Sequence, residues 1–596
     1  MEACDTGLFA YAESVIAPIL EAFFLCQIMP YHAGISPISV SGVSPYGNSM
    51  RTGFPCERLL FRPYRQAGRF SEQEAIMLQI KNLSITHKKD LRMILQDFSF
   101  VLNQGDKAVI IGEEGNGKST LLKWIYDPEL IEPYAEAAGE RIAAGERLAY
   151  LPQELQKKDA AKTLYEFFAE DPSFFEQTPR ELGQLAGSFH LPQAFFYSDQ
   201  PMDSLSGGEK VKAQMMRLLM SQPTVLLLDE PSNDLDIGTL QWLEEMILNW
   251  QGAVLYISHD ETLIERTANM VIHIEQIRRK TVSRYTVSHM PYLQYRQERE
   301  DKFEKQARQA ASERREKEIR DEKYRRIEQS VEHRLNTVSR QAPGKGRLLK
   351  KKMKAVKSME RRFERQDEDM TQMPEEESAI FFKLGEKDAA IPAGKTVIDY
   401  SLPCLRTPDG ARILAKDVSL HVRGSEKIGI IGHNGAGKTT LLRMIAEELL
   451  ARTDIHAAYM PQNYEDLLNL ETNPVDYLAR TGDKEELTQI RTFLGSLKYT
   501  FDEMDHPIAE LSGGQKAKVL LLKMSLSGAN VLILDEPTRN FSALSAPVIR
   551  RMLAEFPGAV ISISHDRKYL TEVCDKVYRL TEEGLLQDSS FLQESH

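Results

Sequence analysis

The sequence predicts a duplicated α/β protein, in which two similar domains with parallel sheets are joined by an antiparallel α-helical hairpin. Three observations support this. A short apolar run leads into a glycine-rich loop twice, at Ala108–Gly112 and at Lys427–Gly432. Each loop is followed by a second apolar run that ends in Asp-Glu, and a highly charged stretch separates the two halves. A buried strand, a glycine loop and then a helix are typical of parallel α/β domains.

The strands of the two halves correspond in order. The runs at residues 225–229 and 254–259 are almost wholly apolar, and the runs at 531–535 and 560–565 match them. Continuous apolar runs of this length are typical of parallel strands buried on both faces. Since the order of motifs is the same in both halves, we interpret the chain as a duplication.

The length of 596 residues is too great for a single core, which agrees with several domains. We assign residues 77–290 to the first α/β domain, 291–370 to the hairpin and 371–596 to the second α/β domain. Residues 1–76 contain an apolar stretch, Val15–Met29, that is shorter than a bilayer-spanning helix.

We interpret residues 1–76 as a disordered extension or the product of an upstream start codon, with Met77 as the natural start. A membrane or partner anchor is the alternative. No other segment predicts a membrane span. The net charge of −12 does not exclude a nucleic-acid partner, because local patches determine such binding.

The cysteines do not predict a metal site or a disulfide framework. There are 5 of them, they are scattered, and no two form a Cys-x-x-Cys pair. This usage fits a reducing cytoplasm.

The charged stretch shows two narrow apolar stripes at helical spacing. They consist of Ile327, Val331 and Leu335 in the first helix and of Leu349, Met353, Val356 and Phe363 in the second. Proline and glycine at 341–346 predict the break where the chain reverses. The stripes and the break together predict two antiparallel helices.

Around this break the acidic residues disappear. Like charges repel unless a polyanion neutralises them, so we expect the tip to contact the backbone of a folded RNA. A merely solvated helix end is the alternative. The residues expected to contact RNA are Arg340, Lys345, Arg347, Lys350, Lys351, Lys352, Lys354 and Lys357.

Both glycine-rich loops match the pattern of a phosphate-binding loop. Consecutive backbone N–H groups at a helix N-terminus bind phosphate, and the lysine reaches the β- and γ-phosphates of ATP. In the first loop the predicted ATP-binding residues are Gly112, Glu113, Glu114, Gly115, Asn116, Gly117, Lys118, Ser119 and Thr120. In the second they are Gly432, His433, Asn434, Gly435, Ala436, Gly437, Lys438, Thr439 and Thr440.

The acidic strand ends complete the predicted hydrolytic sites. We expect Mg²⁺ to be held by a loop hydroxyl and the first acid, and the second acid to orient and deprotonate the attacking water. The predicted Mg²⁺ ligands are Ser119 with Asp229 and Thr439 with Asp535, and the predicted bases are Glu230 and Glu536.

The motif Leu-Ser-Gly-Gly, at residues 205–208 and 511–514, resembles the signature of the ATP-binding cassette (ABC) superfamily. The resemblance implies further site residues. Gln153 and Gln462 match the glutamine that touches Mg²⁺ and water, and His259 and His565 match the histidine at the γ-phosphate.

In that superfamily two cassettes enclose two ATP molecules head to tail. The resemblance therefore implies a monomer whose own cassettes form the sandwich. Ser206, Gly207 and Gly208 would close on the ATP held by Lys438. Ser512, Gly513 and Gly514 would close on the ATP held by Lys118.

The sequence departs from the family pattern in two places. His87 and either Leu405 or Arg406 stand where an aromatic residue usually stacks on adenine. The aspartate that couples the two sites is present as Asp236 but is replaced by Ser542 in the second cassette. We therefore expect unequal ATP sites, with the Lys118 site affected, because the opposing cassette supplies its cross-interface loop.

Paired cassettes, the lack of a membrane domain and a charged helical linker resemble the ABC-F family. That resemblance implies binding at the tRNA exit site of the ribosome, with the linker reaching toward the peptidyl-site tRNA and the peptidyl-transferase centre. The expected partners are ribosomal RNA and that tRNA, not DNA or a membrane, and the expected location is cytoplasmic.

Within this family the loop at residues 538–542 and the long linker are similar to the branch that protects ribosomes from antibiotics. A housekeeping translation factor that rescues stalled ribosomes is the alternative. A transporter ATPase with separate membrane subunits is a further one, although such a motor needs no basic hairpin. A DNA-repair or chromatin ATPase would predict zinc cysteines or a longer coiled coil.

Overall fold

A computed structural model describes most of the chain after residue 75. The described ranges are 76–143, 145–277, 282–337, 343–368, 370–371, 390–407, 410, 412–497 and 499–591. They belong to one unit that extends from Leu59 to His596. The extension predicted at the N-terminus, up to residue 75, lies outside the described residues, and so does Arg340 of the predicted RNA-contacting set.

The first cassette, which we define as the elements from β1 to β9, is built on a six-stranded sheet of order β5-β6-β7-β3-β8-β9. All neighbours are parallel except β9, which is antiparallel to β8. The strands are β3 (Lys107–Ile111), β5 (Leu148–Leu151), β6 (Val225–Asp229), β7 (Ala253–Ile257), β8 (Met270–Ile277) and β9 (Val282–Ser288).

Alternate residues of the central strand β3 enter two separate cores. Ala108 and Ile110 pack with an antiparallel sheet of order β2-β1-β4 and with the first helix, whereas Val109 and Ile111 pack with the later helices. This period of two explains why the strand is apolar at every position after its first. The antiparallel strands are β1 (Ile76–His87), β2 (Met93–Asn103) and β4 (Ala135–Ile142).

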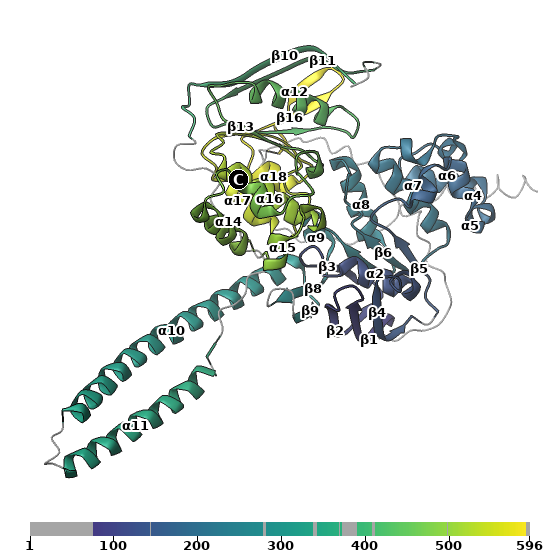
Figure 1. Cartoon of the computed structure of the whole chain (residues 1–596). Coiled ribbons are helices and arrows are strands. Elements are labelled where there is room, and N and C mark those ends of the chain that lie inside the picture. Colours follow the sequence, from purple (N-terminus) through teal and green to yellow (C-terminus); the bar gives the residue numbers. More distant parts are fainter. Residues whose placement is uncertain are drawn as a thin grey trace, which may run out of the picture. The chain divides into compact units, whose positions relative to one another are not determined.

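The helices of the first cassette follow the predicted order of strand, glycine loop and helix (Figure 1). They are α2 (Lys118–Tyr126), α3 (Lys157–Ala160), α4 (Leu164–Ala169), α5 (Pro172–Glu176), α6 (Pro179–Ser188), α7 (Gly207–Met220), α8 (Ile237–Asn249) and α9 (Glu261–Thr267).

The second cassette, from β10 to β17, repeats this plan, with a six-stranded sheet of order β13-β14-β15-β12-β16-β17 and an antiparallel pair β10-β11. The strands are β10 (Thr396–Arg406), β11 (Ile413–Arg423), β12 (Lys427–Ile431), β13 (Ala457–Met460), β14 (Val531–Asp535), β15 (Ala559–Ile563), β16 (Lys576–Thr581) and β17 (Gly584–Gln587). The helices are α12 (Lys438–Leu450), α13 (Pro474–Leu478), α14 (Lys484–Ser496), α15 (Phe501–Asp505), α16 (Gly513–Leu526), α17 (Ala546–Ala554) and α18 (Arg567–Glu572).

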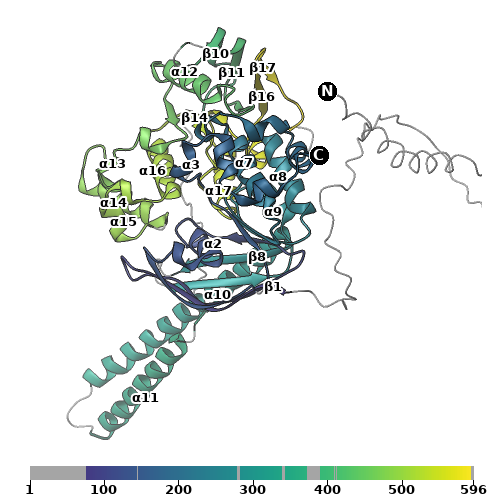
Figure 2. The same cartoon turned by 90° about the vertical axis from the view of Figure 1, so that its right-hand side faces the viewer.

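Two long helices, α10 (Tyr292–Asn336) and α11 (Pro343–Glu368), lie side by side between the cassettes in sequence (Figures 1 and 2). Arg320 of α10 pairs with Asp367 and lies 4.7 Å above the Phe363 ring of α11, and Lys317 Nζ is 2.9 Å from Asp367. The predicted α/β duplication joined by a helical hairpin is therefore confirmed.

One detail of the predicted break is wrong. The sequence placed the reversal at 341–346, but α11 already begins at Pro343, so Gly344 and Gly346 lie inside its first turns. A proline is well suited to the first helical position, because its fixed φ is helical and its missing N–H would have no partner there.

The base of α10 is attached to both cassettes. The Tyr292 hydroxyl donates to the carbonyl oxygen of Ala543 (3.2 Å), and the Tyr295 hydroxyl lies 2.8 Å from Nδ1 of His273. Arg296 forms an ion pair with Glu261 of α9. The first turns of the hairpin therefore contact both cassettes.

None of the helices in the described part of the chain is both long and apolar enough to span a lipid bilayer.

Candidate functional site

The two glycine-rich loops turn back tightly between a strand and a helix. Gly112 has φ of 144°, and a Cβ atom there would lie 2.2 Å from the carbonyl oxygen of Ile274. Lys118 Nζ donates to the carbonyl oxygens of Gly112 (2.8 Å) and Glu113 (3.1 Å). The second loop repeats this arrangement, and its lysine donates to the carbonyl oxygens of the first two loop residues at 2.9 and 3.0 Å.

Replacing Gly112 by alanine is expected to abolish ATP binding at the first loop. The added methyl group meets backbone, which cannot move aside without displacing β8. Gly115→Ala is the matched control, because a Cβ there meets no atom within 4 Å and only its φ of 77° is unfavourable. Equilibrium binding of a fluorescent ATP analogue, in a background where Lys438 is replaced, measures both. Equal affinities of the two variants would contradict the expected clash.

Each loop faces a buried carboxylate at the end of a strand. The Ser119 hydroxyl donates to Asp229 (2.9 Å), and the Tyr150 hydroxyl also donates to it (3.1 Å). Burial raises the pKa of Asp229 and of Asp535, although hydrogen bonds from hydroxyl groups oppose the rise. Asp535 Oδ2 is buried and has no hydrogen-bond partner among the described residues.

A glutamate follows each aspartate and lies against a histidine. His259 Nε2 is 3.0 Å from Glu230 Oε1, and the His259 backbone N–H donates to the same carboxylate (3.2 Å). His565 Nε2 is 3.7 Å from Glu536, and its backbone N–H donates at 3.3 Å. Both glutamates have left-handed backbone, with φ of 50° and 53°. Such strain is concentrated at functional sites.

Burial controls the protonation of these pairs. It raises the pKa of Glu230 and of Glu536 to about 8. Burial, together with the nearby loop lysine, lowers the pKa of His259 and of His565 to about 3. Each site therefore combines a carboxylate of raised basicity with a neutral imidazole, an arrangement suited to moving a proton near neutral pH.

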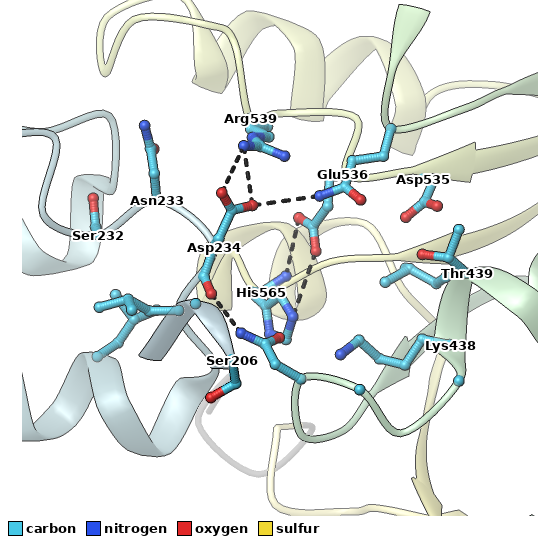
Figure 3. Close-up of a pocket in the computed structure, with 18 of the residues that line it drawn as sticks. Ser206, Ser232, Asn233, Asp234, Lys438, Thr439, Asp535, Glu536, Arg539 and His565 are labelled. Atoms are coloured by element: carbon cyan, nitrogen blue, oxygen red, sulfur yellow. Dashed lines mark hydrogen bonds and ion pairs between the residues drawn. The ribbon is translucent and has the colours of Figure 1, made fainter. Parts of the chain in front are cut away.

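A cavity of about 740 Å³ lies between the second phosphate loop and the signature motif of the first cassette. Figure 3 shows Lys438 and Thr439 on one side and Ser206 on the other, with Glu536 and His565 between them. The structure thus brings together the two halves of a site that lie far apart in sequence.

Asp234, in the loop after β6, forms much of the contact at this cavity. Arg539 lies 3.0 Å from its carboxylate (Figure 3). Gln462 Nε2 donates to the same carboxylate at 3.5 Å, and Asn434 donates to the carbonyl oxygen of Asp234. His433 Nδ1 lies 3.2 Å from the carboxylate of Asp236.

The first phosphate loop meets the second cassette differently. The Gly514 backbone N–H donates to the carboxylate of Glu114 (2.6 Å). The Ser542 hydroxyl donates to Glu113 at 3.2 Å, and the Ser545 hydroxyl also donates to it. A cavity of about 380 Å³ adjoins these acids, and Lys118 is not among the residues that line it.

The signature serines shape their own helices. Ser206 and Ser512 each accept from the backbone N–H three residues on, as N-caps of α7 and α16. Of the signature glycines, Gly207 lines the larger cavity and Gly514 the smaller one, whereas Gly208 packs against Thr239 and Gly513 against Asn540.

The matched glutamines differ. Gln462 lines the larger cavity, whereas Gln153 is exposed in the turn after β5 and does not line the smaller one.

The positions expected to contact adenine differ as well. The His87 ring lies 6.5 Å from the ring of Tyr134, and its Nδ1 lies 2.9 Å from Asp90. In the second cassette Leu405 is fully buried, while Thr407, Arg412 and Leu414 line the larger cavity. The sequence did not single out Tyr134, whose ring lies beside that of His87, or Arg412, which lines the larger cavity.

The basic residues of α11 are all exposed. The described members of the predicted set are Lys345, Arg347, Lys350, Lys351, Lys352, Lys354 and Lys357. They extend from the first turn of α11 to its middle, so the positive charge covers the half of this helix nearest the tip.

Several contacts between the cassettes were not predicted from sequence. They are those of Asp234, Arg539 and Ser545, and that of Lys518, whose Nζ lies 3.7 Å from Glu113. Asp234 and Arg539 lie in the loops already recognised after each Asp-Glu pair, which was the signal available. Their partners are 200 or more residues away, for example Asn434 for Asp234 and Arg539 for the same aspartate at a separation of 305.

Comparisons with known proteins agree with this arrangement. A family model described as ABC transporter matches residues 95–233 and again residues 415–539. The chain is 27% identical over 501 residues to the ribosome protection protein VmlR of Bacillus subtilis, covering 81% of this chain and 83% of that protein. It is 27% identical over 550 residues to the energy-dependent translational throttle protein EttA of Escherichia coli, covering 83% and 91%.

Among solved structures, the archaeal ribosome recycling factor aABCE1, in complex with the stalk protein aP1, superposes with a TM-score of 0.51 and 16% identity. The match covers 86% of this chain and 91% of that chain. At this identity the similarity concerns the fold.

Proposed function

The chain is an ATP-binding cassette protein with an ABC transporter domain in each half and hydrolyses ATP, and on this basis we propose that it acts on the ribosome. We assign it to the ABC-F family, in which the hairpin reaches toward the peptidyl-transferase centre. The boundaries proposed for its parts are 77–290, 291–370 and 371–596.

The first step is the binding of ATP between the cassettes. The backbone N–H groups of each phosphate loop and its lysine hold the phosphates, as expected of a loop that precedes a helix N-terminus. The lysine that is bonded to loop carbonyls turns to the β- and γ-phosphates. The signature motif of the opposite cassette closes over the γ-phosphate. The cavity between Ser206 and Lys438 supports this arrangement, because it is lined by both cassettes.

The residues at the strand ends fit a magnesium ion. Mg²⁺ is held in such sites by one or two protein oxygens together with substrate phosphates. The Ser119 hydroxyl beside Asp229 forms such a pair, and the unpartnered oxygen of Asp535 beside Thr439 forms the other. When bound, the ion would neutralise charge on the phosphates. Gln462 is positioned to contact it, and Gln153 would have to move inward.

Hydrolysis then depends on the glutamate–histidine pairs. Glu230 and Glu536, in their ionised form, would accept a proton from the attacking water, and the raised pKa makes each carboxylate a stronger base. His259 and His565 are neutral and would contact the γ-phosphate. Loss of that phosphate removes the anion that both cassettes hold, so hydrolysis releases the closed state.

The hairpin is the part of the chain that supports binding to the ribosome. From Arg334 to Met359 the chain contains no Asp or Glu, and the seven described basic side chains of its second helix are exposed. An uncompensated basic surface of this kind suits the phosphate backbone of RNA. The anchoring of α10 by both cassettes supports a mechanism in which ATP-driven closure sets the position of the hairpin.

Ribosome association is tested by cosedimentation of the variant Glu230→Gln, Glu536→Gln with ribosomes. We expect this variant to cosediment in ATP and not in ADP, because blocked hydrolysis retains the closed state. The wild-type protein in ATP is the control and should cosediment less. A variant that stays in the supernatant in ATP would contradict the proposal, and recovery with membranes would favour a transporter subunit.

Protection from antibiotics is the more specific function that we propose, and similarity to VmlR supports it. Similarity to EttA supports the alternative, a translation factor. Replacing Lys350, Lys351 and Lys352 by glutamine should abolish drug protection in cells and reduce ribosome binding. The matched control is Arg308→Gln, which removes a base already paired with Glu304. If cells with the wild-type protein are as susceptible to the drugs as cells without it, antibiotic protection is contradicted and the translation-factor role remains.

A further inference from the structure

The two phosphate loops differ at their second and third positions. The first loop carries Glu113 and Glu114, whereas the second carries His433 and Asn434. The loops that oppose them differ in the other sense. The loop of the first cassette carries Asp236, and the loop of the second cassette carries Ser542 at the corresponding position. Each site therefore places an acidic residue on one loop and a residue that can donate a hydrogen bond on the facing loop.

At the Lys438 site, the phosphate loop supplies the hydrogen-bond donors. His433 Nδ1 lies 3.2 Å from the carboxylate of Asp236, and Asn434 donates to the carbonyl oxygen of Asp234. The His433 side chain is 83% exposed, so this contact is at the surface and weakly held.

At the Lys118 site, the phosphate loop supplies the acceptors. Glu113 accepts from the hydroxyls of Ser542 (3.2 Å) and Ser545, and its other oxygen lies 3.7 Å from Nζ of Lys518. Ser545 is fully buried, and the Ser542 side chain and Lys518 are nearly so. Glu114 accepts from the backbone N–H of Gly514 at 2.6 Å.

We propose that the Lys118 site makes the same kind of cross-interface contact as the pair of Asp236 and His433, but with donor and acceptor exchanged. Glu113 supplies the acid that Ser542 does not, and the serine hydroxyls act as donors in place of a histidine. Glu113 and Glu114 are thus positioning residues that hold the second cassette to the first phosphate loop. This inference rests on the proposed function and deepens it, because it concerns the regulation of the same ATP sites.

The contact of Glu114 also affects nucleotide binding at the Lys118 site. In the proposed closed state the N–H groups at the start of α16 bind the γ-phosphate, but Glu114 already accepts from one of them. The carboxylate therefore occupies a place suited to phosphate, and ATP must displace it. Because Glu113 and Glu114 hold the second cassette against the first phosphate loop, the Lys118 site should exchange nucleotide more slowly than the Lys438 site, which adjoins the larger cavity.

The experiment is a double-mutant cycle on the full-length protein. Its variants are Glu113→His, Ser542→Asp and the two together, which copies the pair of the Lys438 site. Closure is measured by energy transfer between dyes on the two cassettes as ATP is titrated. Each single change should raise the ATP concentration for half-closure about tenfold. Glu113→His removes the carboxylate that accepts from the serine hydroxyls, and Ser542→Asp places two acids in contact.

The double variant should reverse most of that increase in the ATP concentration for half-closure. It again places a donor opposite an acid, with the donor in the phosphate loop and the acid in the opposing loop, as at the Lys438 site. The proposal would be overturned if the double variant raised the ATP concentration for half-closure by the product of the two single increases. The pair Asp236→Ser, His433→Glu makes the reverse exchange at the Lys438 site. Its cycle should show recovery of the same sign but smaller size, because the His433 contact lies at the surface. If wild type closes in ATP but fails to bind ribosomes, the proposed function fails while the cycle remains interpretable.

A milder variant guards against misfolding. Glu114→Gln keeps the size of the side chain and removes its charge, so ATP should bind the Lys118 site several-fold more tightly and exchange faster. His433→Gln is the matched change on the other loop and should not tighten binding. Thermal unfolding of every variant, compared with wild type, identifies any that are not folded. Weaker ATP binding by folded Glu114→Gln would also overturn the proposal.

Discussion

Replacing Glu536 by glutamine should lower steady-state ATP turnover about a hundredfold, whereas Glu230→Gln should lower it less than about tenfold. A positioned general base contributes on the order of a hundredfold or more, and glutamine keeps the shape while losing the proton acceptor. The Lys438 site adjoins the open cavity, so it is expected to carry most of the turnover. We expect the two loop acids, which contact the second cassette, to slow turnover at the Lys118 site.

The measurement is phosphate release at saturating ATP, with ATP affinity measured separately for each variant. Glutamine at either position should leave ATP affinity within a few-fold of wild type, since neither glutamate is in the phosphate loop. Equal losses of turnover in the two variants would contradict the inequality of the sites.

The second large effect concerns a buried ionic cluster between the cassettes. Arg550 is 2% exposed and lies 2.6 Å from Glu261, which is 1% exposed, and 2.7 Å from Glu572. Arg296 at the base of the hairpin and Lys568 also pair with Glu261. Arg550→Met should lower the free energy of unfolding by about 3 kcal/mol, because it leaves buried carboxylate charge without its central partner.

Thermal unfolding measures the destabilisation, and hydrogen exchange should localise it to α9, α18 and the first turns of α10. Glu572→Gln is the matched control. Its carboxylate is 49% exposed, so removing its charge should cost less than about 1 kcal/mol. An Arg550→Met protein as stable as this control would show that the cluster does not hold the cassettes together.

Much of the fold was accessible from the sequence because its signals are local. The strands β6 and β14 begin and end where the apolar runs at 225–229 and 531–535 do. A strand buried on both faces must be apolar almost throughout, so its pattern needs no knowledge of its neighbours. The glycines of the phosphate loops are recognised locally as well, from their spacing in the motif, although the clash that requires Gly112 comes from the carbonyl oxygen of Ile274 in β8.

The tip of the hairpin shows where local reasoning was insufficient. Proline and glycine both interrupt helices, but proline also begins them, and only the position of the neighbouring helix distinguishes the two cases. The glycines at 344 and 346 lie in open surroundings, since a Cβ at either would meet no atom within 4 Å, and the long helix continues past them.

The order of residues alone establishes that this protein has two nucleotide-binding cassettes, a basic hairpin and a serine, Ser542, in place of the coupling aspartate. It also leads to the expectation that the Lys118 site differs from the other. The nature of that difference emerges from the folded molecule. Glu113 meets Ser542 across 429 residues, and Arg550 meets Glu261 across 289. Such pairs leave no periodic trace in the chain, because they depend on which surfaces the folded cassettes bring together.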